Sequence, residues 1–182
     1  AGLQYAHLAA AVVGALWPIV LAQFALKHGA PPGRGAIVLA MGSLGAGKLN
    51  ASSDLDLIVI YDAPGDGSSE GPRPLSTRAY YARATQALIT ALTVPMSEGR
   101  LYEVDMRLRP SGNQGPVATS WAAFQSYQQD EAWVWEHLAL TRARTVAGPA
   151  ELSRDVEAFR ANLLSVKGDP ARVWAGVVDM RT

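Results

Sequence analysis

The chain has 182 residues, no cysteine, and equal numbers of basic and acidic side chains, 16 Lys and Arg against 16 Asp and Glu. This length suffices for one hydrophobic core, or for a domain with a helical appendage. A net charge of zero makes nucleic acid an unexpected partner, so an anionic substrate would be met by a local patch. Without cysteine the chain has no disulfides, thiolate metal ligands or thiol nucleophiles, which fits a reducing, cytoplasmic location.

The first 26 residues contain no Asp, Glu, Lys or Arg, and they predict an apolar helix over residues 3–27. Such a helix is long enough to cross a membrane. Gln4, His7, Pro18 and Gln23 interrupt it, and the absence of a basic segment at its start argues against a signal peptide. We therefore expect a helix buried in a globular core, with no membrane partner. The absence of an initial Met, and an end within a predicted helix, favour a piece of a longer protein.

The rest of the chain is organised around a glycine-rich turn between two apolar runs. Residues 36–41 and 57–61 each predict a buried strand. The turn carries Gly42 and Ser43, and Asp54 and Asp56 come at the start of the second strand. Residues two apart in a strand point to the same side, with Cα atoms about 6.6 Å apart. The two carboxylates are therefore able to hold hard cations jointly.

A second informative stretch follows a polar loop over residues 62–74 and a helix that begins at Ser76. Residues 101–109 alternate between apolar and charged side chains, which predicts a strand. One face of this predicted strand carries only charged side chains, those of Glu103, Asp105, Arg107 and Arg109. A turn over residues 110–116 ends it.

The remainder of the chain predicts helices only, from about residue 120, over 130–147, over 150–166, and from 170 to the end. The composition therefore indicates a mixed α/β catalytic core over residues 1–118 and a helical part over residues 119–182. We expect Trp121, Trp133 and Trp135 to pack in the interior or between helices, rather than to stack on bases.

Two common loop motifs resemble parts of this pattern but do not fit it. A phosphate-binding P-loop requires Ser or Thr after its Lys and a helix behind it, whereas Leu49 follows Lys48 and a strand comes next. A calcium-binding EF-hand loop requires polar and glycine positions where Ile58 and Val59 stand. Taken alone, the two aspartates would be acids at the exposed start of a strand.

The combination of three strands changes this interpretation. Asp54, Asp56 and Asp105 on neighbouring strands would repel one another strongly unless cations lie among them. Two divalent ions would remove that repulsion and assist in-line phosphoryl chemistry. Gly42 permits close approach of the backbone to a triphosphate, and the Ser43 hydroxyl is able to donate to its oxygens. The arginines beside Asp105 suit contact with phosphate or with a protein substrate. These residues together predict a nucleotidyl-transfer site.

The same motifs resemble those of a known family. The Gly42-Ser43, Asp54-Leu-Asp56 and Val104-Asp-Met106 motifs are similar to the pattern of the polymerase β-type nucleotidyltransferase superfamily. Longer stretches resemble bacterial glutamine synthetase adenylyltransferase, namely Ser53-Asp-Leu-Asp-Leu-Ile, Gly99-Arg-Leu-Tyr-Glu-Val-Asp-Met-Arg-Leu-Arg-Pro-Ser-Gly112, Gly115-Pro-Val-Ala-Thr-Ser120, Glu131-Ala-Trp-Val-Trp-Glu-His137 and Thr141-Arg-Ala-Arg144. This resemblance runs from about residue 36 to residue 148. The family has a Lys in the glycine turn where this chain has Ser43.

The resemblance implies an α+β fold, a polymerase β-like mixed sheet with flanking helices followed by a helical segment. It also implies transfer of AMP from ATP to a tyrosine hydroxyl of glutamine synthetase, with Mg²⁺ or Mn²⁺ held by the three aspartates. Gly42, Ser43, Ser53, Arg107 and Arg109 would then contact the nucleotide. Further implied partners are a PII-type signal protein and other domains of the same enzyme. Two alternatives are the adenylyl-removing activity of that enzyme, and a non-catalytic module that docks a signal protein.

Overall fold

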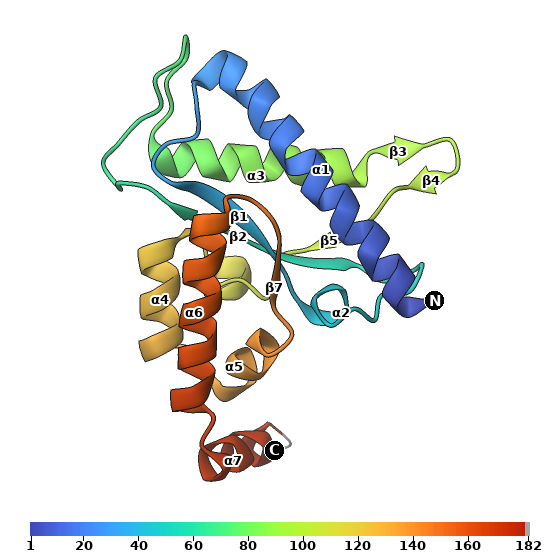
Figure 1. Cartoon of the computed structure of the whole chain (residues 1–182), viewed down its shortest axis with the longest axis vertical. Helices are drawn as coiled ribbons and strands as arrows, with labels where there is room; N and C mark the ends of the chain where they lie inside the picture. The colour runs from blue at the N-terminus through green and yellow to red at the C-terminus, as the bar shows by residue number, and fades with distance from the viewer. Residues whose placement is uncertain (181–182) are drawn as a thin grey trace.

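The computed structural model describes residues 1–180 and consists of one central sheet with helices on both faces (Figure 1). The sheet strands, in chain order, are β1 (Gly35–Ala40), β2 (Leu55–Asp62), β5 (Val104–Asp105), β6 (Ala118–Ser120) and β7 (Arg144–Ala147). A separate two-stranded hairpin is formed by β3 (Pro95–Met96) and β4 (Gly99–Arg100). The expected mixed sheet with flanking helices is confirmed.

The sheet combines antiparallel and parallel pairs around β2. Its order is β5-β2-β1-β7, and β6 also pairs with β2. Strand β1 is antiparallel to both β2 and β7, whereas β5 and β6 run parallel to β2. The register places Asp56 opposite Asp105 and Tyr61 opposite Ser120, so β5 pairs with the start of β2 and β6 with its end.

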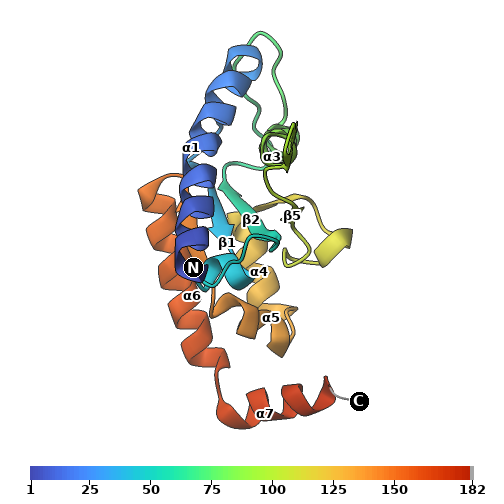
Figure 2. The same cartoon turned by 90° about the vertical axis from the view of Figure 1, so that its right-hand side faces the viewer.

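Helices α1 and α3 cover one face of the sheet, and α4 and α6 cover the other, as the turned view in Figure 2 also shows. The helices are α1 (Gly2–His28), α2 (Gly42–Gly45), α3 (Thr77–Thr93), α4 (Trp121–Asp130), α5 (Val134–Leu140), α6 (Ala150–Lys167) and α7 (Pro170–Asp179), and a short 3₁₀ turn spans Gly112–Gln114. Ser76 and Ser120 begin α3 and α4 as expected, because each side-chain oxygen accepts a hydrogen bond from a backbone N–H three residues on.

Alternate residues of β1 and β2 enter two separate cores, which explains why both strands are apolar throughout. Val38 and Val59 pack beneath α1 and α3, around Trp17 and Tyr80. Their neighbours Ile37, Leu39, Ile58 and Ile60 pack with α4 and α6 on the other face. A strand that is buried on both faces has no polar side, so its sequence is a continuous hydrophobic run.

Helix α1 is buried along one face only. Its buried residues are Ala6, Ala9, Val13, Trp17 and Val20, spaced three or four apart as expected for one side of a helix. The indole Nε1 of Trp17 donates to the Ala36 carbonyl across 3.2 Å, which fixes the helix to β1. Within residues 1–180, α1 is the one helix whose length and composition would allow it to cross a membrane. Its opposite face, with Leu8 and Leu26, is exposed.

The predicted strand over residues 101–109 is largely wrong. Only Val104 and Asp105 form a strand, and the chain turns directly afterwards. The Asp105 carboxylate accepts the backbone N–H of Arg107 across 2.9 Å, and the Arg109 N–H donates to the Met106 carbonyl. These local hydrogen bonds compete with strand pairing and explain the turn.

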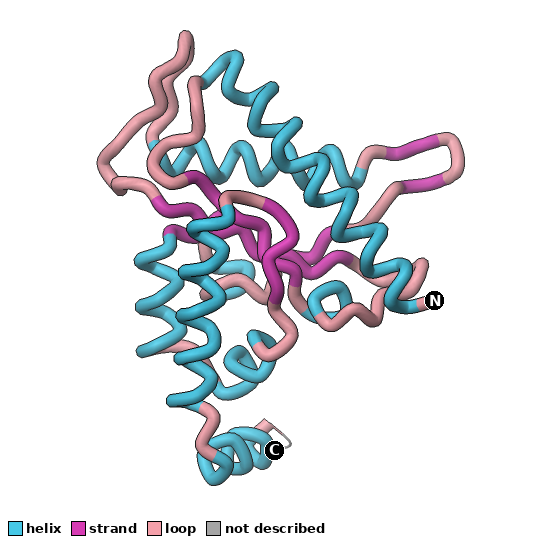
Figure 3. The backbone as a smooth tube through the Cα atoms, in the orientation of Figure 1, coloured by secondary structure: helices cyan, strands magenta, loops and turns pink. Residues whose placement is uncertain are grey.

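The expectation that the chain is helical after about residue 118 is also wrong in part. Strands β6 and β7 lie beyond that point and belong to the central sheet (Figure 3). The helix expected over residues 130–147 is limited to α5, because the chain turns after it and enters β7. Trp133 and Trp135 do not lie in the interior, since their exposed fractions are 70% and 42%, but both line a hollow between α5 and α7, in keeping with the alternative of packing between helices. Residues 181 and 182, in the last predicted helix, lie outside the described residues.

Candidate functional site

The site is built where the start of β2 meets β5. Asp56 lies within β2 directly opposite Asp105 of β5, as the parallel register requires. Asp54 precedes β2, and its charge, like that of Asp105, raises the pKa of Asp56. Asp105 is thus brought beside Asp56 although about fifty residues separate the two along the sequence, whereas a shared metal site of all three acids stays a prediction.

The glycine turn lies against the same carboxylates. The Met41 N–H donates to the Asp56 carbonyl across 2.8 Å, which joins the start of α2 to β2. Gly42 has a φ of 53° and contacts Asp56 so closely that a β-carbon at this position would overlap the carboxylate oxygen Oδ2. Ser43 follows in the first turn of α2 and is partly exposed. Only glycine combines this backbone conformation with this proximity to Asp56.

Arg107 neutralises one of the three acids. Its guanidinium donates from Nε to both oxygens of Asp105 and from Nη2 to Oδ2, at 2.6 to 3.1 Å. The Arg107 side chain is 71% exposed, whereas that of Asp105 is 14% exposed. The arginine is therefore a solvent-facing cation that covers a mostly buried carboxylate.

The other two predicted nucleotide-binding residues, Ser53 and Arg109, form hydrogen bonds within their own loops. Arg109 donates to the carbonyl groups of Met106, Gly115 and Pro116, which supports the turn after β5. The Ser53 hydroxyl accepts the N–H of Asn50 across 3.1 Å. Arg109 still acts on the site, because its charge lowers the pKa of Asp105.

The pKa values of Asp56 and Asp105 are shifted in opposite directions. Burial, followed by the charges of Asp105 and Asp54, raises the pKa of Asp56 above its usual value. The hydrogen bonds from Arg107 hold the pKa of Asp105 below its usual value, against the effect of burial. Burial and the neighbouring acids together outweigh the opposing charge of Arg107 at Asp56, and a cation placed beside this carboxylate would stabilise its ionised form.

The donor set fits divalent metal ions of the hard class. Carboxylate oxygens are the ligands that Mg²⁺ and Mn²⁺ prefer, and a guanidinium already acts as a stand-in cation on Asp105. In the part of the chain that the structure describes, no group of three His, Cys, Asp or Glu side chains is already gathered in metal-binding geometry. Both Asp105 oxygens accept hydrogen bonds from Arg107, so a metal at Asp105 would compete with that arginine.

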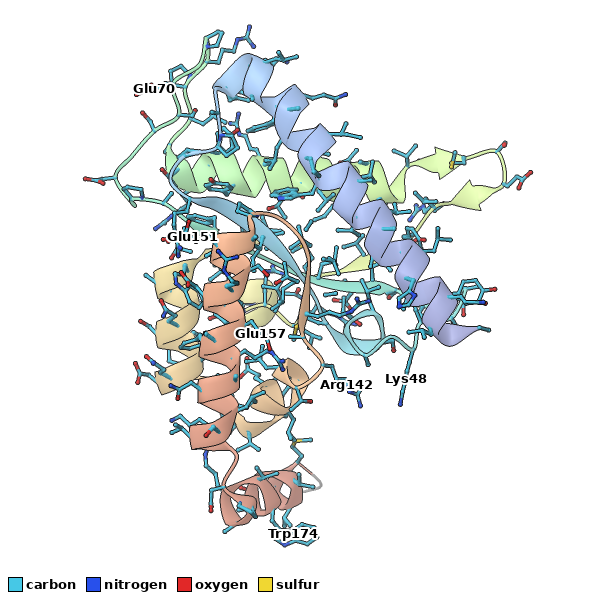
Figure 4. The ribbon with its side chains drawn as sticks, in the orientation of Figure 1. Lys48, Glu70, Arg142, Glu151, Glu157 and Trp174 are labelled. Carbon is cyan, nitrogen blue, oxygen red and sulfur yellow. The ribbon has the colours of Figure 1, made fainter. Side chains whose placement is uncertain are left out.

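Two arginines of the chain after α5 also lie beside the glycine turn. Arg144 donates from Nη2 to the Leu44 carbonyl across 3.3 Å. The Arg142 backbone carbonyl packs so closely on Gly45 that a β-carbon there would overlap it. Figure 4 shows the Arg142 side chain extending from the segment between α5 and β7, near α2. The sequence offered the Thr141-Arg-Ala-Arg144 motif as the only indication of this contact.

Comparison with known proteins identifies the family to which the sequence is related. A family model described as glutamate-ammonia ligase adenylyltransferase matches residues 2–159. Similar proteins include the bifunctional glutamine synthetase adenylyltransferase/adenylyl-removing enzymes of Agrobacterium fabrum and Xanthobacter autotrophicus, each 49% identical, and that of Mesorhizobium japonicum, 47% identical. Each alignment covers 100% of this chain and 18% of the relative.

The chain thus spans about a fifth of the length of these curated relatives. The family model nevertheless covers most of the chain, including the glycine turn, β2, β5 and the arginines after α5. The chain belongs to the glutamate-ammonia ligase adenylyltransferase family.

Proposed function

We propose that this chain carries the site that transfers AMP from ATP to a tyrosine hydroxyl of glutamine synthetase, with release of pyrophosphate. The observation that carries the proposal is the register of β2 with β5, which sets Asp56 opposite Asp105, with Asp54 beside them. The membership of the family, whose relatives are named as enzymes that act on glutamine synthetase, supports the same reaction.

In this proposal Asp54, Asp56 and Asp105 would hold the Mg²⁺ or Mn²⁺ ions. Such ions lower the pKa of an oxygen nucleophile and neutralise the leaving pyrophosphate. Asp105 would also accept the tyrosine proton, after Arg107 has moved away from its carboxylate. Binding of an ion between these carboxylates would offset the repulsion that now raises the pKa of Asp56.

The phosphates would lie on the glycine turn. Gly42 leaves space beside Asp56 because it has no β-carbon, and the Ser43 hydroxyl and nearby N–H groups suit phosphate oxygens. Arg107, displaced from Asp105, would remain near enough to pair with the triphosphate. We propose that a cation from the segment after α5 serves in place of the Lys that the family has in this turn.

The remaining expectations follow from the same assignment. By resemblance to the family, glutamine synthetase would be the protein substrate, and a PII-type signal protein and other domains would regulate the reaction in the cytoplasm. The adenylyl-removing reaction, which is part of the relatives' names, is the nearest alternative. A docking module without catalysis is the second alternative, and three converging acids argue against it.

The test compares the full-length gene product with its Asp56→Asn variant. With ATP, Mg²⁺ and unmodified glutamine synthetase, we expect AMP attached to glutamine synthetase and free pyrophosphate. The variant should give neither product. It should still fold, because the replacement leaves the side-chain volume unchanged. In a second assay the substrates are AMP-modified glutamine synthetase and phosphate. Formation of ADP by the unaltered protein, and not by the Asp56 variant, would assign the opposite reaction to this site. Near-normal AMP transfer by the Asp56→Asn variant would contradict the proposal.

A further inference from the structure

Next to the glycine turn lies a hollow whose apolar wall the assignment above does not use. It has a volume of about 440 Å³, within the range of small-molecule sites. The lining residues come from the glycine turn, from the chain after β5 and from α5 with its following turn, and they are Gly42, Leu108, Trp135, Leu138, Ala139, Thr141 and Arg142. Gly42 is therefore shared between this hollow and the acidic site, since it also contacts Asp56.

The chemistry of the hollow is divided between an apolar wall and a cation. Trp135 is 42% exposed although its indole would gain from burial, and Leu138 beside it is also exposed. Arg142 lies at the same hollow, and its backbone packs against the turn at Gly45. An exposed indole suits a planar ring, and a guanidinium suits phosphate oxygens. One ligand that offers both groups is a nucleotide.

We propose that this hollow receives the nucleoside of the nucleotide substrate, with the base stacked on Trp135 and Arg142 facing the phosphates. This inference rests on the proposed function, because it takes the acidic site as the place of the reacting phosphorus. In a nucleotide one ribose separates the base from that phosphorus, and the hollow begins at the residue that contacts Asp56.

The position of the hollow also distinguishes the base from the tyrosine of the protein acceptor. In phosphoryl transfer the attacking and leaving oxygens lie roughly in line, on opposite sides of the phosphorus. The glycine turn holds the leaving pyrophosphate in the proposed arrangement, so the tyrosine approaches from the side away from the turn. A hollow bordered by Gly42 therefore lies on the side of the nucleotide, away from the side on which the tyrosine approaches.

The test measures binding of two probes, ATP and inorganic tripolyphosphate, to the full-length gene product by calorimetry with Mg²⁺ and no glutamine synthetase. We expect Trp135→Ala to weaken ATP binding about ten-fold or more and to leave tripolyphosphate binding unchanged, because stacking is lost while the phosphate contacts remain. Trp135→Phe should retain most of the affinity for ATP. Arg142→Gln should weaken the binding of both probes.

The matched control is Trp133→Ala. Trp133 is 70% exposed, lies two residues before Trp135, and is not part of this hollow. Its removal should leave both affinities unchanged, whereas equal ATP affinities for the Trp133 and Trp135 variants would overturn the inference. A Trp135 variant that binds ATP normally but has a raised KM for glutamine synthetase would assign the hollow to the protein acceptor and overturn it too. Failure of the unaltered protein to bind either probe would overturn the proposed function as well.

Discussion

Replacement of Gly42 by alanine tests whether the glycine turn and the acids act as one site. Gly42 has a φ of 53°, a left-handed conformation that costs an alanine about 1–2 kcal/mol. For a domain of this size such a loss lowers the melting temperature by roughly 2–8 °C. The added β-carbon would also overlap Asp56 Oδ2 and lie 3.1 Å from its Cγ, so the carboxylate has to rotate away.

The displacement of the carboxylate sets the expected effect on activity. A shift of about 1 Å in a reacting group costs on the order of 100-fold in rate. We therefore expect Gly42→Ala to lose about 100-fold in AMP transfer and to bind Mn²⁺ more weakly. Initial rates with labelled ATP would measure the first effect, and Mn²⁺ titration followed by electron paramagnetic resonance would measure the second.

Gly47→Ala provides the matched control. Gly47 also has a positive φ, 71°, but its added β-carbon would meet only the end of the flexible Leu3 side chain, at 3.2 Å. Both variants should therefore lose a similar amount of stability, while only Gly42→Ala loses metal affinity and activity. The reasoning is refuted if the two variants have equal activity and equal Mn²⁺ affinity after correction for the folded fraction.

Three further predictions concern single contacts. Arg107→Gln frees the Asp105 carboxylate and should raise the affinity for Mn²⁺ in the absence of nucleotide, a result that an unchanged titration curve would contradict. Burial lowers the pKa of the His137 imidazole, so as the pH falls the ring binds a proton in the unfolded chain before it does so in the folded protein. Stability should therefore fall as the pH drops below about 6.5, and His137→Gln should flatten this part of a plot of melting temperature against pH. Trp17→Phe removes the hydrogen bond to the Ala36 carbonyl and should cost about 1–2 kcal/mol in urea unfolding; no loss would show that this bond contributes nothing.

The sequence predicted the elements in which one physical signal dominates. Continuous apolar runs marked β1 and β2, and helical periodicity with a serine cap marked α3 and α4. The convergence of Asp54, Asp56 and Asp105 followed from the placement of their strands, and the register of β2 with β5 agrees with it.

The parts that failed are those in which local hydrogen bonds override a pattern. Alternation over residues 101–109 suggested a long strand, but the Asp105 side chain bonds the chain two residues on and turns it. Strand β7 was missed because its four residues gain stability only by pairing with β1, a partner about a hundred residues earlier. The exposure of Trp135 was not predicted, because the apolar character of an indole does not show by itself how much of the ring other residues cover.

The contact between Arg107 and Asp105 has a consequence for the order of folding and metal uptake. In many small metal-binding domains the ligands repel one another until the ion arrives, so the chain stays unfolded without it. Here an internal counterion occupies the acid that lies on β5. The pairing of β5 with β2 therefore has its own counterion in Arg107, and an ion bound as proposed above would meet strands that are already paired.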